Sequence, residues 1–243
     1  MRLKLEIAAN SLGSALAAQE GGADRVELCE NLGEGGCTPS CGTLALARDR
    51  LRIPLYVLIR PRAGDFVYDA LETDVMLRDI ALCRQLGCDG VVIGALDADG
   101  GIDLPLCREL VAAAAGMGIT FHRAFDVARD PVKSLEDIVS LGCERVLTSG
   151  AADSAGQGAD AIRRAVLQSA GRIAVMAGAG VTADNVRTLV EASGVCEVHA
   201  SAKARRVSPM QQQRSVAGLE ADWLQSDAAQ VRRLRDALDR AAG

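Results

Sequence analysis

The feature that most constrains this chain is a regular alternation of short β-rich runs with amphipathic runs rich in Ala and Leu. Most of the amphipathic runs end in Gly, which is typical of a helix stop before the next strand. Eight β-rich runs are present, beginning at Leu3, Arg25, Leu55, Gly90, Ile119, Arg145, Ile173 and Glu197. This pattern predicts an α/β fold, a TIM-type (β/α)8 barrel. An open doubly wound sheet is the alternative, but units that fill the chain from end to end favour closure.

The barrel is expected to be a single domain over residues 1–243, interrupted by a long polar segment at 203–225 before the last helix. The chain is 49% hydrophobic and 24% charged, which suits one large core. No shift in composition along the chain suggests a second domain.

Composition also argues against several classes of partner. The net charge of −5, with one Trp, two Tyr and three Phe, lacks the basic surplus and stacking groups of a nucleic-acid-binding protein. Charges inside the first apolar run, "MRLKLEIAAN", argue against a signal peptide or membrane span, so we expect a cytoplasmic protein that binds no membrane. Its eight cysteines are then expected to be free thiols, most of them in the core.

The period of two along a strand indicates which side chains point into the barrel. If the bulky residues of the first two strands face the helices, Glu6, Glu27 and Cys29 point inward. The same parity turns Phe121, Arg123 and Phe125 outward on the fifth strand. Parity and strand ends together place one polar set at the barrel mouth: Glu6, Glu27, Arg60, His122, Asp126, His199 and Ser201.

Polar side chains at the carboxyl ends of strands are what an active site requires in this fold. We expect Glu6, Glu27, His122 and Asp126 to be the catalytic group. Glu6 or Glu27 would accept a proton, and His122 would donate one or stabilise an oxyanion. Alternatively, Glu6, Glu27, Arg60 and His122 satisfy one another and only fill the barrel.

Two further strand ends could bind the substrate. "RVLTSG" supplies Ser149, and "MAGAGVTADN" supplies Gly178 and Gly180 before a helix that Thr182 could cap. Free N–H groups in such loops can hold an anion, although tight βα connections also use glycines. Candidate substrate-binding residues are therefore Arg60, Arg123, Ser149, Gly178, Gly180, His199 and Ser201.

Several long strings resemble the copper homeostasis family CutC, in matching order to about Lys203. They are "LEIAANSLGSALAAQEGGADRVELCENLGEGGCTPS", "IRPRAGDFVYD", "TFHRAFDVARDP", "RVLTSG" and the H-x-S of "EVHASA". The resemblance implies a (β/α)8 barrel, a cytoplasmic homodimer and a role in copper handling. It also marks positions that match the family pattern: Glu6, Glu27, Arg60, Arg62, Asp65, His122, Arg123, Asp126, Ser149, Gly150, His199 and Ser201.

Copper needs a separate argument, because Cu(I) prefers two or more soft thiolate or thioether ligands. The resemblance implies a thiol on each of the first two strands. Here Cys29 matches the second, but Ala8 occupies the first. We therefore expect weak Cu(I) binding at Cys29. A cysteine restored at position 8 could meet it across the strand pair, and a replacement site on Cys37 and Cys41 is the alternative.

Two functions from different classes follow. One is a copper-handling protein, which binds Cu(I) or influences its level. The other is an enzyme that uses Glu and His acid–base chemistry on a small anionic or phosphorylated substrate.

Overall fold

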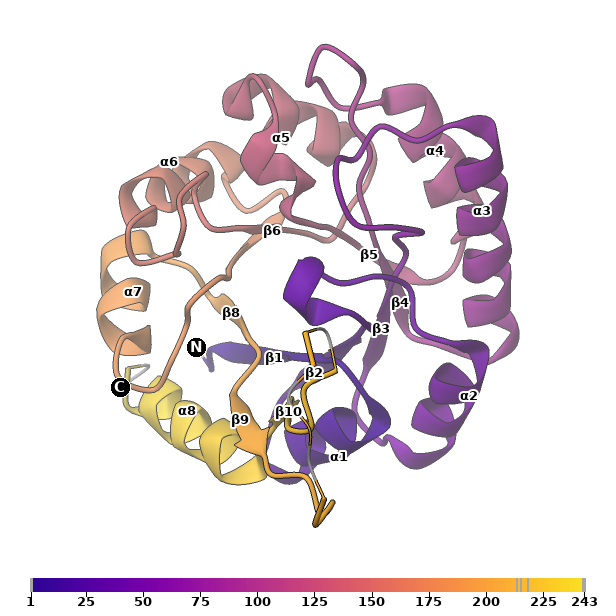
Figure 1. Cartoon of the computed structure of the whole chain (residues 1–243). Helices are drawn as coiled ribbons and strands as arrows, with labels where there is room; N and C mark the ends of the chain where they lie inside the picture. The colour runs from indigo at the N-terminus through magenta and orange to yellow at the C-terminus, as the bar shows by residue number, and fades with distance from the viewer. Residues whose placement is uncertain (1, 213, 215, 218, 242–243) are drawn as a thin grey trace.

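Eight parallel strands close into a barrel in the computed structural model, which describes residues 2–212, 214, 216–217 and 219–241 (Figure 1). Each strand pairs with the next along the chain, and β8 pairs with β1 to close the ring. The strands are β1 (Lys4–Ala9), β2 (Arg25–Leu28), β3 (Leu55–Leu58), β4 (Gly90–Ile93), β5 (Gly118–Phe121), β6 (Arg145–Thr148), β7 (Ala174–Ala177) and β8 (Glu197–Ala200). The predicted (β/α)8 barrel is confirmed.

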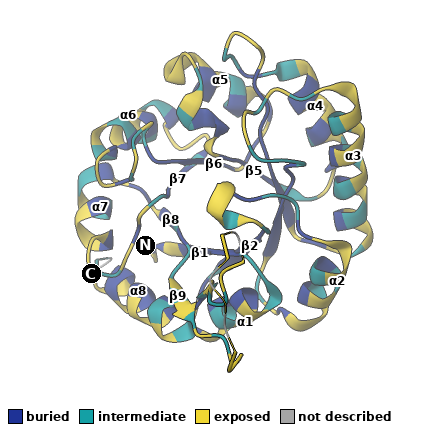
Figure 2. Cartoon of the chain, viewed as in Figure 1, coloured by how far each residue is buried: buried dark blue, intermediate teal, exposed yellow. Residues whose placement is uncertain are grey.

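One α-helix follows each barrel strand and covers its outer face. The helices are α1 (Leu12–Glu20), α2 (Cys41–Arg50), α3 (Ala70–Gln85), α4 (Leu104–Ala113), α5 (Pro131–Ser140), α6 (Ala159–Ser169), α7 (Val186–Ser193) and α8 (Ala228–Ala241). Figure 2 shows their buried sides turned toward the strands and their exposed sides outward. Two 3-10 turns, η1 (Leu32–Glu34) and η2 (Arg123–Val127), lie in the connections after β2 and β5.

Most helix starts follow capping residues of the sequence, whereas α6 and α7 begin after Gly158 and Asn185 without a side-chain cap. The side chains of Ser11, Ser40 and Asp69 accept from the backbone N–H groups of the first turns of α1, α2 and α3. The expected cap at Thr182 is wrong. Helix α7 begins at Val186, because Thr182 heads a turn in which its carbonyl accepts from the N–H groups of Asn185 and Val186.

Two kinds of side chain alternate along the strands, as expected. Leu5, Ile7, Val26 and Leu28 are fully buried between strands and helices, where each stabilises the fold by about 1.5–3 kcal/mol. Tyr56 occupies part of the interior near the amino ends of the strands. Its ring lies against β4 and its hydroxyl against β5, since an added Cβ would lie 2.2 Å from the ring at Gly90 and 2.0 Å from the hydroxyl at Gly118.

The polar segment 203–225 contains regular structure that its composition does not reveal. Strands β9 (Lys203–Arg206) and β10 (Trp223–Ser226) form an antiparallel pair between β8 and α8. The Ser226 N–H donates to the Ser14 hydroxyl of α1 at 3.0 Å, which ties the pair to the barrel. Positions 213, 215 and 218 of this segment, and Ala242 of the expected last helix, lie outside the described residues.

None of the helices in the described part of the chain is both long enough and apolar enough to cross a membrane.

Candidate active site

A cavity of about 770 Å³ opens at the carboxyl ends of the barrel strands. Eight of the expected catalytic or substrate-binding residues line it: Glu27, Arg60, His122, Arg123, Asp126, Gly180, His199 and Ser201. Glu6, Ser149 and Gly178 do not line it, and neither does Cys29. The structure therefore gathers most of the predicted polar set around one space and places Glu6 beneath it.

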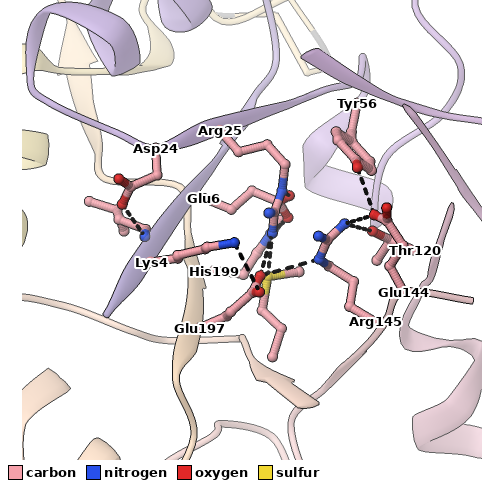
Figure 3. A network of polar contacts seen from close by, with 12 residues as sticks. Lys4, Glu6, Asp24, Arg25, Tyr56, Thr120, Glu144, Arg145, Glu197 and His199 are labelled. Atoms are coloured by element: carbon pink, nitrogen blue, oxygen red, sulfur yellow. Dashed lines mark hydrogen bonds and ion pairs between the residues drawn. The ribbon is translucent and has the colours of Figure 1, made fainter. Parts of the chain in front are cut away.

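Below the cavity, the barrel interior holds a network of paired charges (Figure 3). Arg25 donates to both Glu6 and Glu197, and Arg145 donates to Glu197 at 3.2 Å and to the Thr120 hydroxyl at 3.0 Å. Sequence reasoning missed Arg25, Arg145 and Glu197. A signal was available, because Arg25 shares the inward parity of Glu27, and Glu197 shares that of His199.

Glu6 connects this network to the site. Burial raises the pKa of Glu6, but Arg25 and His199 outweigh burial and lower the pKa to about 2. Glu6 is therefore ionised at neutral pH and fully buried. Its Oε1 lies 2.7 Å from His199 Nδ1, which accordingly carries the proton and donates it.

His199 lies between two carboxylates. Its Nδ1 is 4.0 Å from Glu27 Oε2, in addition to its contact with Glu6. Burial lowers the pKa of His199, but Glu27 and Glu6 outweigh burial and raise it above the ordinary value. The two carboxylates thus favour the protonated form of His199 relative to a free imidazole.

Glu27 lines the cavity and keeps one carboxylate oxygen without a hydrogen bond among the described residues. The residue is 5% exposed, and the unpaired oxygen is Oε2. Burial raises the pKa of Glu27 to about 7, against the opposing effect of His199. A carboxyl group with this pKa can accept and return a proton at neutral pH.

His122 presents the complementary group. Its Nδ1 accepts from the Ala124 N–H at 3.1 Å, which places the ring proton on Nε2. This Nε2 is buried and has no partner. Burial and the charge of Arg60 lower the pKa of His122 to about 3, so the ring is neutral and donates one N–H. Gly94 makes room for it, since an added Cβ there would lie 2.5 Å from the ring.

The alternation of inward and outward side chains no longer applies after His122, because the chain leaves the strand there. Strand β5 ends at Phe121, and residues 123–127 form the turn η2. Arg123, whose parity pointed outward, lines the cavity instead, and its guanidinium donates to Asp126 at 2.7 Å and to the Ser149 hydroxyl at 2.9 Å. The expected outward direction of Arg123 is wrong for this reason.

Asp126 joins η2 to the end of β6. Its carboxylate accepts from the Thr148 and Ser149 hydroxyls and from the Ser149 and Ala151 N–H groups, in addition to Arg123. Its acceptor capacity is therefore largely used by the protein. Ser149 Oγ also donates to the Ala152 carbonyl at 2.6 Å, so it is held as a structural link.

Arg60 is held by the backbone of two loops. Its terminal nitrogens donate to the carbonyls of Glu34, Gly36 and Gly64 at 2.7–3.0 Å, and its guanidinium lies 5.0 Å above the Phe66 ring. Only its Nε lacks a partner. Arg60 thus fixes the loops after β2 and β3 and contributes positive charge beside His122.

The loops after β7 and β8 form the opposite wall. The N–H groups of Gly180 and Val181 donate to no acceptor within the described residues, whereas the Gly178 N–H donates to the Thr148 carbonyl. Gly178 has a spatial role, since an added Cβ would lie 2.6 Å from Leu147 and 3.3 Å from His199. Lys203 lines the same wall, and among the described residues no carboxylate pairs with it.

No cysteine is among the residues that line the cavity, although Cys37 lies close enough to Cys29 to help raise the pKa of its thiol. All eight cysteines are free, and Cys29 is fully buried, with its Sγ 3.7 Å from the Ala9 carbonyl. Burial and Glu27 raise the pKa of Cys29, which disfavours the thiolate. The strand register places Ala8 opposite Glu27, so a thiol at position 8 would face Cys29 diagonally rather than directly across the strand pair.

A group of three possible metal ligands occurs in the described part of the chain. Glu6, Glu27 and His199 each offer one ligand atom, and these atoms lie within 4.8 Å of one another. Oxygen and imidazole donors do not match the soft-ligand preference of Cu(I). Arg25 and His199 already neutralise Glu6, so the arrangement favours a proton rather than a metal ion.

Fold and site together define a class of protein, a TIM-type barrel with acid–base groups around a cavity at its carboxyl face. The CutC family model matches residues 3–204. A family protein named CutC from Xanthomonas axonopodis pv. citri is 56% identical over 241 residues, which cover 98% of this chain and 99% of the relative. The chain therefore belongs to the CutC family.

Solved structures agree with this membership. A Streptococcus agalactiae crystal structure, named CutC with a provisional copper homeostasis role, matches with 35% identity and a TM-score of 0.79, over 82% of this chain and 98% of that one. A thiamine phosphate pyrophosphorylase from Pyrococcus furiosus matches with 16% identity and a TM-score of 0.63, over 99% and 98% of the two chains. The second similarity shows the shared fold alone.

Proposed function

We propose that this protein is an enzyme that uses Glu and His acid–base chemistry on a small anionic molecule bound at the barrel mouth. One observation carries the proposal. Two side chains that line the same cavity, Glu27 and His122, each bury a polar atom that has no hydrogen-bond partner among the described residues. Leaving such an atom unpaired costs about 1–3 kcal/mol, so a bound ligand that pairs with both would recover that energy.

The charge around the cavity supports an anionic substrate. Arg60, Arg123 and Lys203 line it, while the lining carboxylate of Asp126 is paired with Arg123 at 2.7 Å. Lys203 and the N–H groups of Gly180 and Val181 share one wall, where an anionic substituent would gain both charge and hydrogen bonds. Glu27 and His122 would then act on the part of the substrate deeper in the barrel.

The proposal is tested with purified protein and the small-molecule fraction of a bacterial extract, followed by mass spectrometry. We expect wild type to consume at least one anionic compound and Glu27→Gln to leave it unchanged. His122→Phe, which keeps a ring beside Phe66 but removes the N–H donor, should slow turnover by about 10²–10³-fold. Cys41→Ser, at an exposed cysteine, is the control. If no compound in the extract changes in a way that depends on Glu27, the proposal is contradicted.

Copper handling is the second candidate function, favoured by the copper homeostasis role in the name of the similar Streptococcus agalactiae protein. In this candidate Cys29 binds Cu(I), in a cytoplasmic homodimer. Competition with a Cu(I) chelator under anaerobic, reducing conditions tests the binding, and light scattering tests the dimer. Sub-micromolar Cu(I) affinity that Cys29→Ser abolishes would favour this function over the enzyme.

A further inference from the structure

The proposed enzyme function can be narrowed to a reaction class from the two unpaired atoms and their surroundings. A group that accepts a proton and a neutral group that donates a hydrogen bond occupy one cavity. We infer that the site catalyses proton transfer at a carbon next to a carbonyl, in a small hydroxy-carbonyl compound that carries an anionic group. This inference rests on the proposed function and adds the reaction and the substrate class.

His122 is suited to donate a hydrogen bond to the carbonyl oxygen of such a substrate. Its tautomer is fixed by the Ala124 N–H, so Nε2–H is the group available to a ligand. A neutral imidazole stabilises negative charge that develops on oxygen without giving up its proton. The Phe66 and Phe121 rings, with centroids 5.0 and 5.9 Å from His122, hold the imidazole in place.

Glu27 is placed to remove the proton from the carbon next to that carbonyl. It lines the cavity, and its Oε2 has no hydrogen-bond partner in the described part of the protein. Glu6 cannot share this task, because it is fully buried, bonded to Arg25 and His199, and ionised. His199, 4.0 Å from Glu27, is placed to serve the second oxygen of the substrate.

The step balances without any other reactant. The C–H bond breaks and its proton moves to the Glu27 carboxylate. The C–H electron pair forms a C=C bond while the C=O π pair moves onto the carbonyl oxygen, which gives an enediolate whose O⁻ accepts from His122 Nε2–H. Glu27 then returns the proton to the neighbouring carbon, the hydroxyl proton passes from the second substrate oxygen to the first, and the C=O bond re-forms at the second oxygen. The overall change is an isomerisation, with no net oxidation and no leaving group.

The surroundings disfavour chemistry that needs a nucleophilic side chain. Ser149 Oγ is engaged by Asp126, Arg123 and the Ala152 carbonyl, and Cys29 is sealed from the cavity with a raised thiol pKa. Covalent catalysis by either residue would require it to leave these contacts. Proton transfer uses the groups where they already lie.

Solvent deuterium tests the inference. The extract incubation is repeated in D₂O, and the compounds that change only with active Glu27 are analysed for carbon-bound deuterium. We expect one deuterium in the product of wild type and of the Cys41→Ser control, none with Glu27→Gln, and incorporation slowed by at least 100-fold with His122→Phe.

The two proposals fail in different ways. A Glu27-dependent product without carbon-bound deuterium would overturn the proton-transfer inference and leave the enzyme proposal standing. No Glu27-dependent product at all would overturn both. Incorporation that is equally fast in Glu27→Gln and in wild type would assign the proton transfer to another group and overturn the inference.

Discussion

Replacing Glu27 with Gln should stabilise the protein at alkaline pH, because the pKa of this carboxyl is raised. Its pKa is about 7 in the folded protein and 4.5 ordinarily, and each pKa unit corresponds to 1.36 kcal/mol. The folded state therefore holds the Glu27 proton more tightly than the unfolded state does. Stability is unaffected below about pH 4.5, falls as the pH rises from there to 7, and is lower by about 3 kcal/mol above that range.

Urea unfolding at pH 4.5 and pH 8.5 measures this effect. Gln keeps the shape of Glu27 and cannot ionise, so Glu27→Gln should exceed wild type by about 3 kcal/mol at pH 8.5 and nearly equal it at pH 4.5. The matched control is Glu20→Gln, whose side chain is 72% exposed and should change stability by less than about 0.5 kcal/mol.

The groups that face Glu27 give a second check. His199 lowers the pKa of Glu27, Glu6 raises it and Arg25 lowers it. His199→Gln removes the charge that most favours the ionised form of Glu27. In this background, Glu27→Gln should therefore stabilise the protein at pH 8.5 by more than it does in the wild-type background. Wild type as stable as Glu27→Gln at pH 8.5 would show that Glu27 titrates normally, and the acid–base role would lose its physical basis.

Three further predictions concern the rest of the site. Arg25→Met should cost about 3–5 kcal/mol at pH 7 in urea unfolding, because Glu6 stays buried without its partner, and adding Glu6→Gln should recover part of the loss. Equal stabilities of the single and double variants would contradict this. Gly94→Ala should lower turnover and cost about 1–3 kcal/mol, since its Cβ meets the His122 ring at 2.5 Å, and unchanged turnover would argue against the position of that ring. Wild type and Ala8→Cys should both bind Cu(I) weakly in chelator competition, because Ala8 lies opposite Glu27, and tight binding by Ala8→Cys would restore the thiol-pair hypothesis.

The alternation of inward and outward side chains identified most residues of the barrel mouth, because this alternation holds wherever the strands are regular. Glu6, Glu27 and His199 all point inward, as the alternation on β1, β2 and β8 predicted. The same rule did not hold for Arg123, since the backbone turns at His122. That turn depends on a side-chain contact, His122 Nδ1 with the Ala124 N–H, which periodicity does not encode.

Which charged side chains bond to one another inside the barrel was harder to predict than which of them point inward. The sequence shows that Arg25, Glu27 and Glu197 have an inward parity, but not which of them meet. Register decides this, because Glu6 is aligned with both Arg25 and His199. Arg25 consequently satisfies Glu6 and Glu197, and among the described residues no arginine bonds to Glu27.

The charged side chains below the cavity are paired, whereas several polar side chains at its wall keep an atom without a partner among the described residues. This difference distinguishes a structural plug from a binding site. A plug of paired charges does exist, but it is built from Arg25, Glu6, Glu197 and Arg145 below the cavity, rather than from Glu6, Glu27, Arg60 and His122. Within the described residues, five buried side-chain atoms lack a partner, and three of them belong to residues that line the cavity: Glu27, Arg60 and His122. If filling the barrel were the only role of these residues, their polar atoms would be expected to pair as those beneath them do. Their unpaired state at the mouth is the physical reason to expect a ligand there.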